Sequence, residues 1–217
     1  MRSALAAFAV VVLAAPCMQA DASTGTATLD VSFTATSLDP TLQSQASFDD
    51  LLSFSEGTWS GAPGGPNPPV DGFLTYSLTI LGEPGEGGRG SVTMASGITA
   101  VAQNYPDDIF SIEGDSYGEF ELTPYSEVTM TLSSDVAGTN ASSGGTVTAC
   151  LASQCWKPGM GTSTTFLTFT NDTADTELVN VSASAVAFAS GVPEPSPSLL
   201  LLAGLGLLGT VRSVRRR

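Results

Sequence analysis

The side chains that carry out most hydrolytic chemistry are scarce in this chain of 217 residues. It contains no His, which removes Ser-His-Asp and Cys-His catalysis and most catalytic zinc or copper sites. Ser-Lys chemistry would depend on Lys157, but no Ser-x-x-Lys arrangement lies beside it. Two carboxylates are enough for a glycosidase, but their separation cannot be read from sequence. We therefore expect no enzymatic activity.

One group of acidic residues is dense enough to be considered as a cation site. Ca²⁺ is bound through oxygen ligands, mostly from loops. The group at residues 107–115 does not follow the EF-hand spacing, and a solvated loop is the alternative interpretation. Asp49-Asp50 is a second, smaller acidic pair. Beyond Ca²⁺ we expect no cofactor. The calcium candidates are Asp107, Asp108, Glu113 and Asp115.

Aromatic side chains suggest a different class of site. Sugar rings stack on exposed aromatic rings while neighbouring polar groups fix their orientation. Trp59 and Trp156 both fall in segments that we expect to be loops, and Tyr105 and Tyr117 flank the acidic group. The two tryptophans are therefore the carbohydrate candidates. Packing in the core is the alternative, since Trp156 directly follows Cys155.

Three cysteines bear on the compartment of the protein. Cys17 lies in the N-terminal leader, which leaves Cys150 and Cys155 in the body of the chain. An even number of cysteines in an exported chain predicts a disulfide, worth about 2 kcal/mol for so short a loop. Metal binding is the alternative, but two thiols without His cannot complete a structural zinc site.

The charge of the chain excludes one class of partner. It has 21 acidic and 7 basic residues, and most of the basic ones lie at the two ends. Residues 23–192 hold 19 acidic and two basic residues, a formal charge of −17. Such a domain repels nucleic acids and anionic lipid surfaces. We therefore expect no nucleic-acid partner.

The middle of the chain alternates apolar and polar residues, as half-buried strands do. The run from Leu178 to Phe188 puts Val179, Val181, Ala183, Ala185 and Ala187 on one face. One short helix is expected at Ser47–Phe54, and Gly- and Pro-rich breaks at Gly57–Gly72, Gly82–Gly90 and Ala137–Gly145. This predicts an all-β domain, an antiparallel β-sandwich or jelly-roll-like fold. Further strands are expected at 29–35, 74–80, 92–95, 98–102, 109–112, 118–122, 128–132, 147–151 and 165–170.

The first 22 residues read as a secretory signal peptide. Arg2 supplies the positive charge, Ala4 to Ala15 the apolar helical region, and Ala20-Asp21-Ala22 a cleavage pattern of small residues. Cleavage there would make Ser23 the first mature residue; Met18-Gln19-Ala20 is a second possible site. A lipoprotein signal at Cys17 is disfavoured because Pro16 stands where a small residue is expected.

The C-terminal segment, residues 192–217, has three parts. Val192-Pro193-Glu194-Pro195 is expected to be extended, because each Pro fixes its own φ and disfavours helix before it. A hydrophobic helix is predicted over about 198–211. Its apolar core, Leu199 to Val211, is roughly 20 Å long, short of the roughly 30 Å hydrocarbon layer unless the basic end snorkels. The basic end, 212–217, would stop transfer at the inner membrane through Arg212, Arg215, Arg216 and Arg217.

This tail resembles the PEP-CTERM sorting signal of Gram-negative bacteria. The Pro-Glu-Pro motif, the apolar stretch and the arginines occur in order at the C-terminus, behind a signal peptide. The resemblance implies processing by an exosortase, a membrane-anchored precursor, and later release to the cell surface or extracellular matrix. It also implies an association with exopolysaccharide and biofilms. An ordinary single-pass anchor is the alternative.

These observations define a domain plan and three competing functions. We expect a signal peptide over 1–22, a β-rich extracytoplasmic domain over 23–191 and the sorting segment over 192–217. The first hypothesis is a non-enzymatic surface or matrix component, and the second a carbohydrate-binding or adhesive module. A hydrolase would require a cleft that holds a convergent carboxylate pair. Two segments, 121–128 and 169–173, also resemble stretches of β-sandwich ectodomains that precede such tails.

Overall fold

The computed structural model describes residues 23–39, 41, 47–60, 69–80, 88–104 and 109–190, without the side chains of 48–51. The expected signal helix and the expected C-terminal hydrophobic helix both lie outside these residues. Within them, no helix is long and apolar enough to cross a membrane.

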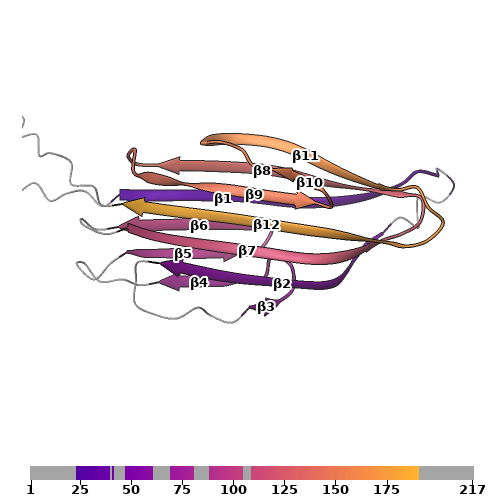
Figure 1. The fold of residues 1–217 in the computed structure, drawn as a ribbon, viewed down its shortest axis with the longest axis horizontal. Helices are drawn as coiled ribbons and strands as arrows, with labels where there is room; N and C mark the ends of the chain where they lie inside the picture. The colour runs from indigo at the N-terminus through magenta and orange to yellow at the C-terminus, as the bar shows by residue number, and fades with distance from the viewer. Residues whose placement is uncertain are drawn as a thin grey trace, which may run out of the picture. The chain divides into compact units, whose positions relative to one another are not determined.

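The described residues form two six-stranded antiparallel sheets that pack face to face (Figure 1). This confirms the predicted all-β antiparallel sandwich. Sheet A has the order β11 (Gly161–Asn171), β8 (Ser126–Gly138), β1 (Ser23–Ser37), β6 (Gly97–Asn104), β5 (Arg89–Met94), β4 (Ser77–Ile80). Sheet B has the order β10 (Gln154–Trp156), β9 (Ser143–Leu151), β12 (Glu177–Ser190), β7 (Ile109–Leu122), β2 (Phe48–Ser60), β3 (Val70–Asp71).

The alternation of the sequence maps directly onto the two faces of each sheet. On β12 the five residues expected on one face, from Val179 to Ala187, are all buried, and the residues between them are not. Successive side chains of a strand point to opposite faces, so this pattern fixes which face of sheet B meets the core. The outer face of sheet B carries mostly Ser, Thr and acidic side chains, together with exposed apolar ones such as Ile109, Leu178 and Phe188.

The core changes character along the strands. Near the start of β1, backbones of the two sheets touch, because a Cβ at Gly25 would collide with the carbonyl oxygens of Phe188 and Gly144. Farther along, Phe33, Phe73 and Phe120 form an aromatic cluster with centroid separations of 5.8, 6.1 and 5.6 Å. Glycine therefore lets the two sheets approach closely near the start of β1. The ring of Phe110 is buried against Gly88 and Gly90 at this same end, so large rings are present at both ends of the core.

The first strand, β1, begins beside the residue where the last strand, β12, ends. Ser23 Oγ donates a hydrogen bond to the carbonyl oxygen of Ser190 at 3.0 Å, and in Figure 1 the start of β1 and the end of β12 lie side by side. The chain therefore enters and leaves the sandwich at the same end.

The opposite end is closed by Asn171, which is fully buried. Its Nδ2 donates to the carbonyl oxygens of Leu122, Thr123 and Asp175 at 3.1, 3.1 and 2.9 Å. In sheet A, Asn171 also lies opposite Ser126. Segments 121–128 and 169–173 are thus neighbours at this end of the sandwich, where their contacts hold strands of the two sheets together.

The helix expected at Ser47–Phe54 is wrong. These residues enter β2, which pairs with β7 along its whole length and carries a bulge between Asp50 and Leu52. The bulge interrupts the period of two, so the run does not read as a strand in the sequence. β2 also continues to Ser60, so the break expected to begin at Gly57 begins only after that residue. The two strands expected at 109–112 and 118–122 are parts of one continuous strand, β7.

Candidate binding face on sheet B

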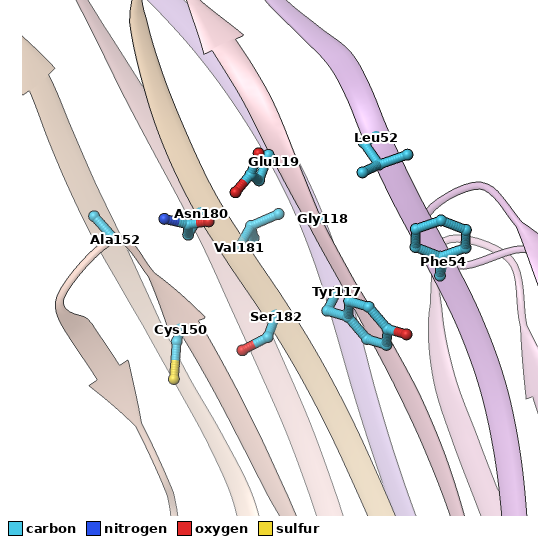
Figure 2. A pocket seen from close by; sticks show the side chains of 10 residues that line it. All are labelled: Leu52, Phe54, Tyr117, Gly118, Glu119, Cys150, Ala152, Asn180, Val181 and Ser182. Atoms are coloured by element: carbon cyan, nitrogen blue, oxygen red, sulfur yellow. The ribbon is translucent and has the colours of Figure 1, made fainter. Parts of the chain in front are cut away.

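A shallow, open hollow of about 440 Å³ lies on the outer face of sheet B. It crosses four strands, β2, β7, β12 and β9, and reaches the turn after β9 (Figure 2). Its lining combines apolar and polar side chains: Leu52, Phe54, Tyr117, Gly118, Glu119, Cys150, Ala152, Asn180, Val181 and Ser182.

The pairing register brings these residues together. Phe54 lies opposite Tyr117, Tyr117 opposite Ser182, and Ser182 opposite Cys150. Directly paired residues of an antiparallel sheet share one face, so the four form a row across the sheet. The row is eight residues from Ser190 along β12, roughly 27 Å from where the chain leaves the sandwich.

Two aromatic rings form one side of the hollow. The rings of Phe54 and Tyr117 have centroids 5.9 Å apart and planes inclined by 40°, a favourable arrangement for an aromatic pair. Tyr117 is 44% exposed and Leu52 is 55% exposed, although both are large apolar side chains. Figure 2 shows Asn180, Ser182 and Glu119 beside this apolar patch, where they supply hydrogen-bonding groups.

Carboxylates occupy the next row of the same face. Asp115 lies opposite Glu56 on β2 and opposite Ser184 on β12, and Glu113 is two residues away on β7. Desolvation raises the pKa of Asp115 to about 6, and the charges of Glu113 and Glu56 add to this, against a hydrogen bond from Ser184. The Glu56–Asp115 pair is outside the hollow, whose one lining carboxylate is Glu119.

The structure describes two of the four calcium candidates. Glu113 and Asp115 lie on the outer face of β7, and Asp107 and Asp108 are outside the described residues. Where the structure describes side chains, no group of three or more His, Cys, Asp or Glu residues could hold a metal ion. The side chains of Asp49 and Asp50 are not described.

The structure does not bring the two tryptophans together. Both were expected in loops, but Trp59 lies in β2 and Trp156 in β10. Each is half-buried and packs against the core, because its pairing partner, Ile112 or Ala149, faces inward. They are four strands apart across sheet B and four residues apart along it, roughly 23 Å in all.

The aromatic residues of the hollow were therefore seen only in part from the sequence. The sequence shows Tyr117 beside the acidic group, whereas Phe54 lies in the segment that the sequence predicts to be helical. The other flanking tyrosine, Tyr105, lies outside the described residues. The signal that could have found Phe54 was an apolar residue at alternate positions, Leu52 and Phe54, just after the bulge.

The expected disulfide between Cys150 and Cys155 is present. The two residues lie directly opposite each other in the β9–β10 hairpin, with their Cα atoms 4.1 Å apart. It joins the three-residue strand β10 covalently to the sheet and borders the hollow through Cys150.

Comparison with protein families identifies the C-terminal segment. Residues 191–217 match the PEP-CTERM protein-sorting motif, a segment that includes Pro193-Glu194-Pro195 and the terminal arginines. Comparison with curated proteins and with solved structures finds no match. The chain thus joins a β-sandwich domain to a PEP-CTERM sorting motif, which marks it as an exported substrate of an exosortase.

Proposed function

We propose that this protein is a non-enzymatic component of the bacterial cell surface or extracellular matrix. The PEP-CTERM match carries the proposal, because that motif implies export, a membrane-anchored precursor and sorting to the surface. The β-sandwich is then the part that acts outside the cell, in contact with exopolysaccharide. The arginine-terminated tail holds the precursor at the inner membrane until the exosortase processes it.

The arrangement of the carboxylates supports a non-enzymatic role. A glycoside hydrolase needs two carboxyl groups that flank the scissile bond of a bound sugar. The hollow has one lining carboxylate, Glu119, and the Glu56–Asp115 pair lies on the open sheet one row away. Desolvation, with the neighbouring charges of Glu113 and Glu56 added to it, accounts for the raised pKa of Asp115 without any catalytic demand.

A second candidate function is carbohydrate binding in the hollow. The paired rings of Phe54 and Tyr117 favour it, because they offer an exposed apolar platform bordered by hydrogen-bonding groups. Carboxylates at Glu56, Asp115 and Glu119 would repel anionic polysaccharide. The ligand class that fits is therefore a neutral or amino-sugar glycan.

Two measurements test these functions. Fractionation of the producing bacterium should place the sandwich domain in the surface and matrix fractions, and a protein confined to the cytoplasm would contradict the first proposal. A glycan array probed with the purified protein should show retention on neutral or amino-sugar polymers. Retention on none of them would remove the second candidate and leave the first.

A further inference from the structure

The four edge strands of the sandwich differ in length and chemistry. Three of them are short: β3, β4 and β10 have two, four and three residues. Proteins commonly use short edge strands, Lys or Pro to stop sheets from pairing edge to edge. β11 has none of these protections. It has 11 residues, Gly161–Asn171, with no charged residue and no Pro.

The backbone of β11 is paired on one side. Its pairing partner is β8, and no described strand lies beyond it, so it forms the upper margin of the sandwich in Figure 1. The carbonyl oxygen of Thr168 accepts a hydrogen bond from Gln154 Nε2 at 2.9 Å, which places that carbonyl on the side away from β8. Backbone groups alternate sides along a strand. Those of Thr162, Thr164 and Phe166 therefore point outward as well.

The side chains of this half of β11 favour pairing with another strand. Thr162, Thr164 and Phe166 share the outer face of sheet A, and Phe166 is 68% exposed. Threonine and aromatic residues are the types that pair best across strands. An exposed, uncharged ladder of this kind is unusual in a domain whose formal charge is −17.

From this arrangement we propose that β11 pairs with β11 of a second copy, antiparallel, about a two-fold axis at Thr164. Thr164 then faces its own symmetry mate, and Thr162 faces Phe166 of the partner. The outward groups of these three residues would form about six backbone hydrogen bonds, and the two sheets would join into one.

A second copy fits this edge better than an unrelated strand for two reasons. The three outward positions are self-complementary, because reversal about Thr164 sets each Phe166 against the partner's β-branched Thr162, a favourable cross-strand pair. The closest fixed charge on this face is Asp135, which receives a hydrogen bond from Thr162 Oγ1 at 3.4 Å. In the dimer the two Asp135 carboxylates are three strand spacings apart across the sheet and four residues apart along it, roughly 20 Å in all, which exceeds the Debye length of about 8 Å at physiological salt.

Cysteine cross-linking of the purified full-length protein tests the register. With a mild added oxidant, Thr164→Cys should give a reducible dimer, because directly opposed residues are within disulfide reach. The matched control is Thr131→Cys, an exposed threonine on the same face of the interior strand β8. Because pairing gives an effective concentration of the order of mM, we expect about tenfold more dimer for Thr164→Cys than for this control.

A second pair of variants checks the axis. Phe166→Cys should not cross-link to itself, since the two copies lie four residues apart along the strands, roughly 14 Å. It should cross-link to Thr162→Cys when the two proteins are mixed. Equal yields for Thr164→Cys and Thr131→Cys would overturn the proposal, and cross-linking of Phe166→Cys to itself would overturn the register.

A charge substitution gives a readout that does not depend on thiols. Thr164→Lys sets two lysines opposite each other and should abolish association in sedimentation velocity, whereas Thr131→Lys should not. Both substitutions lower the net negative charge equally, so general repulsion between the chains cannot explain a difference. Association that survives Thr164→Lys would show that another surface, or another occupant, is used.

Discussion

Tyr117 on β7 and Phe54 on β2 face each other on the solvent side of sheet B, with ring centroids 5.9 Å apart. Each side chain packs against the other instead of against the core, and Tyr117 keeps 44% of its surface exposed. An exposed aromatic face is a surface on which a sugar ring can stack. The pair is therefore where a ligand of this domain is best sought.

Tyr117→Ala should weaken retention on a neutral glycan that the wild-type protein binds. Loss of an aromatic contact is worth about 0.5–1.5 kcal/mol, which corresponds to about 2- to 13-fold weaker binding. Affinity electrophoresis in gels that contain the glycan measures the change. Tyr125→Ala is the matched control, because Tyr125 is equally exposed, at 43%, but lies in the β7–β8 turn. Equal losses in both variants would remove the hollow as the binding site.

Asp115→Asn should stabilise the sandwich at neutral pH. Desolvation and the neighbouring carboxylates raise the folded-state pKa of Asp115 to about 6, above its ordinary value of 3.8. The folded protein therefore holds the extra proton between about pH 4 and 6, and this contribution to stability is lost as the pH rises through that window. With solvent screening taken into account, the gain from Asp115→Asn should be about 1 kcal/mol at pH 7 and near zero at pH 3.

Urea unfolding at several pH values provides the measurement for this variant. Asp172→Asn is the control for loss of one charge, since Asp172 lies in the exposed β11–β12 loop. A stability gain for Asp115→Asn that stayed constant from pH 3 to 7 would contradict the assigned cause, because titration of the carboxyl could not then produce it.

Replacement of both Cys150 and Cys155 by Ser should lower the free energy of unfolding by about 2 kcal/mol, the chain-entropy value for a short loop. The effect should be concentrated at the sheet edge, because β10 has three residues and is joined to β9 by this bond. Thermal unfolding measures the total. Reduction of the wild-type protein should reproduce it, and an unchanged midpoint on reduction would show that the hairpin is stable without the bond.

Gly25→Ala should destabilise the domain by about 1–3 kcal/mol, the usual cost of an overpacked site. The added methyl group would press on backbone carbonyl oxygens of the opposite sheet, at Phe188 and Gly144, which cannot rotate away as side chains do. Gly159→Ala is the matched control, because a Cβ there meets nothing within 4 Å. Chemical unfolding of the two variants should separate them clearly, and equal stabilities would show that the sheets can move apart at Gly25.

The sandwich was predictable because most strands keep an unbroken alternation, as β12 does from Val179 to Ala187. β2 was not, because the bulge at Asp50–Leu52 shifts the pattern midway. The hollow depends on the neighbours β9, β12, β7 and β2, and strand order comes from long-range packing that local patterns do not encode. The loops expected around the two tryptophans were wrong for a related reason. Their Gly- and Pro-containing surroundings suggest loops, but pairing with Ile112 and Ala149 holds them in strands.

The last prediction concerns the sorting segment, residues 191–217. Replacement of Pro193-Glu194-Pro195 by three alanines should leave the unprocessed, membrane-bound precursor to accumulate. A processing enzyme must reach an extended backbone, and the two prolines keep this segment out of helix and out of sheet ladders. Immunoblots of membrane and surface fractions follow the precursor and the mature form over time.

Two features of the chain sharpen this test. The β-sandwich ends at Ser190, which accepts the hydrogen bond from Ser23, so the triple substitution lies beyond the last strand and should leave the unfolding midpoint unchanged. Replacement of Arg215, Arg216 and Arg217 by Ala serves as the companion variant, because it should weaken membrane retention through loss of the basic stop and leave the Pro-Glu-Pro motif intact. A triple-alanine protein that reached the surface at the normal mass and rate would contradict processing at this motif. A plain membrane anchor would then be the better account of the tail.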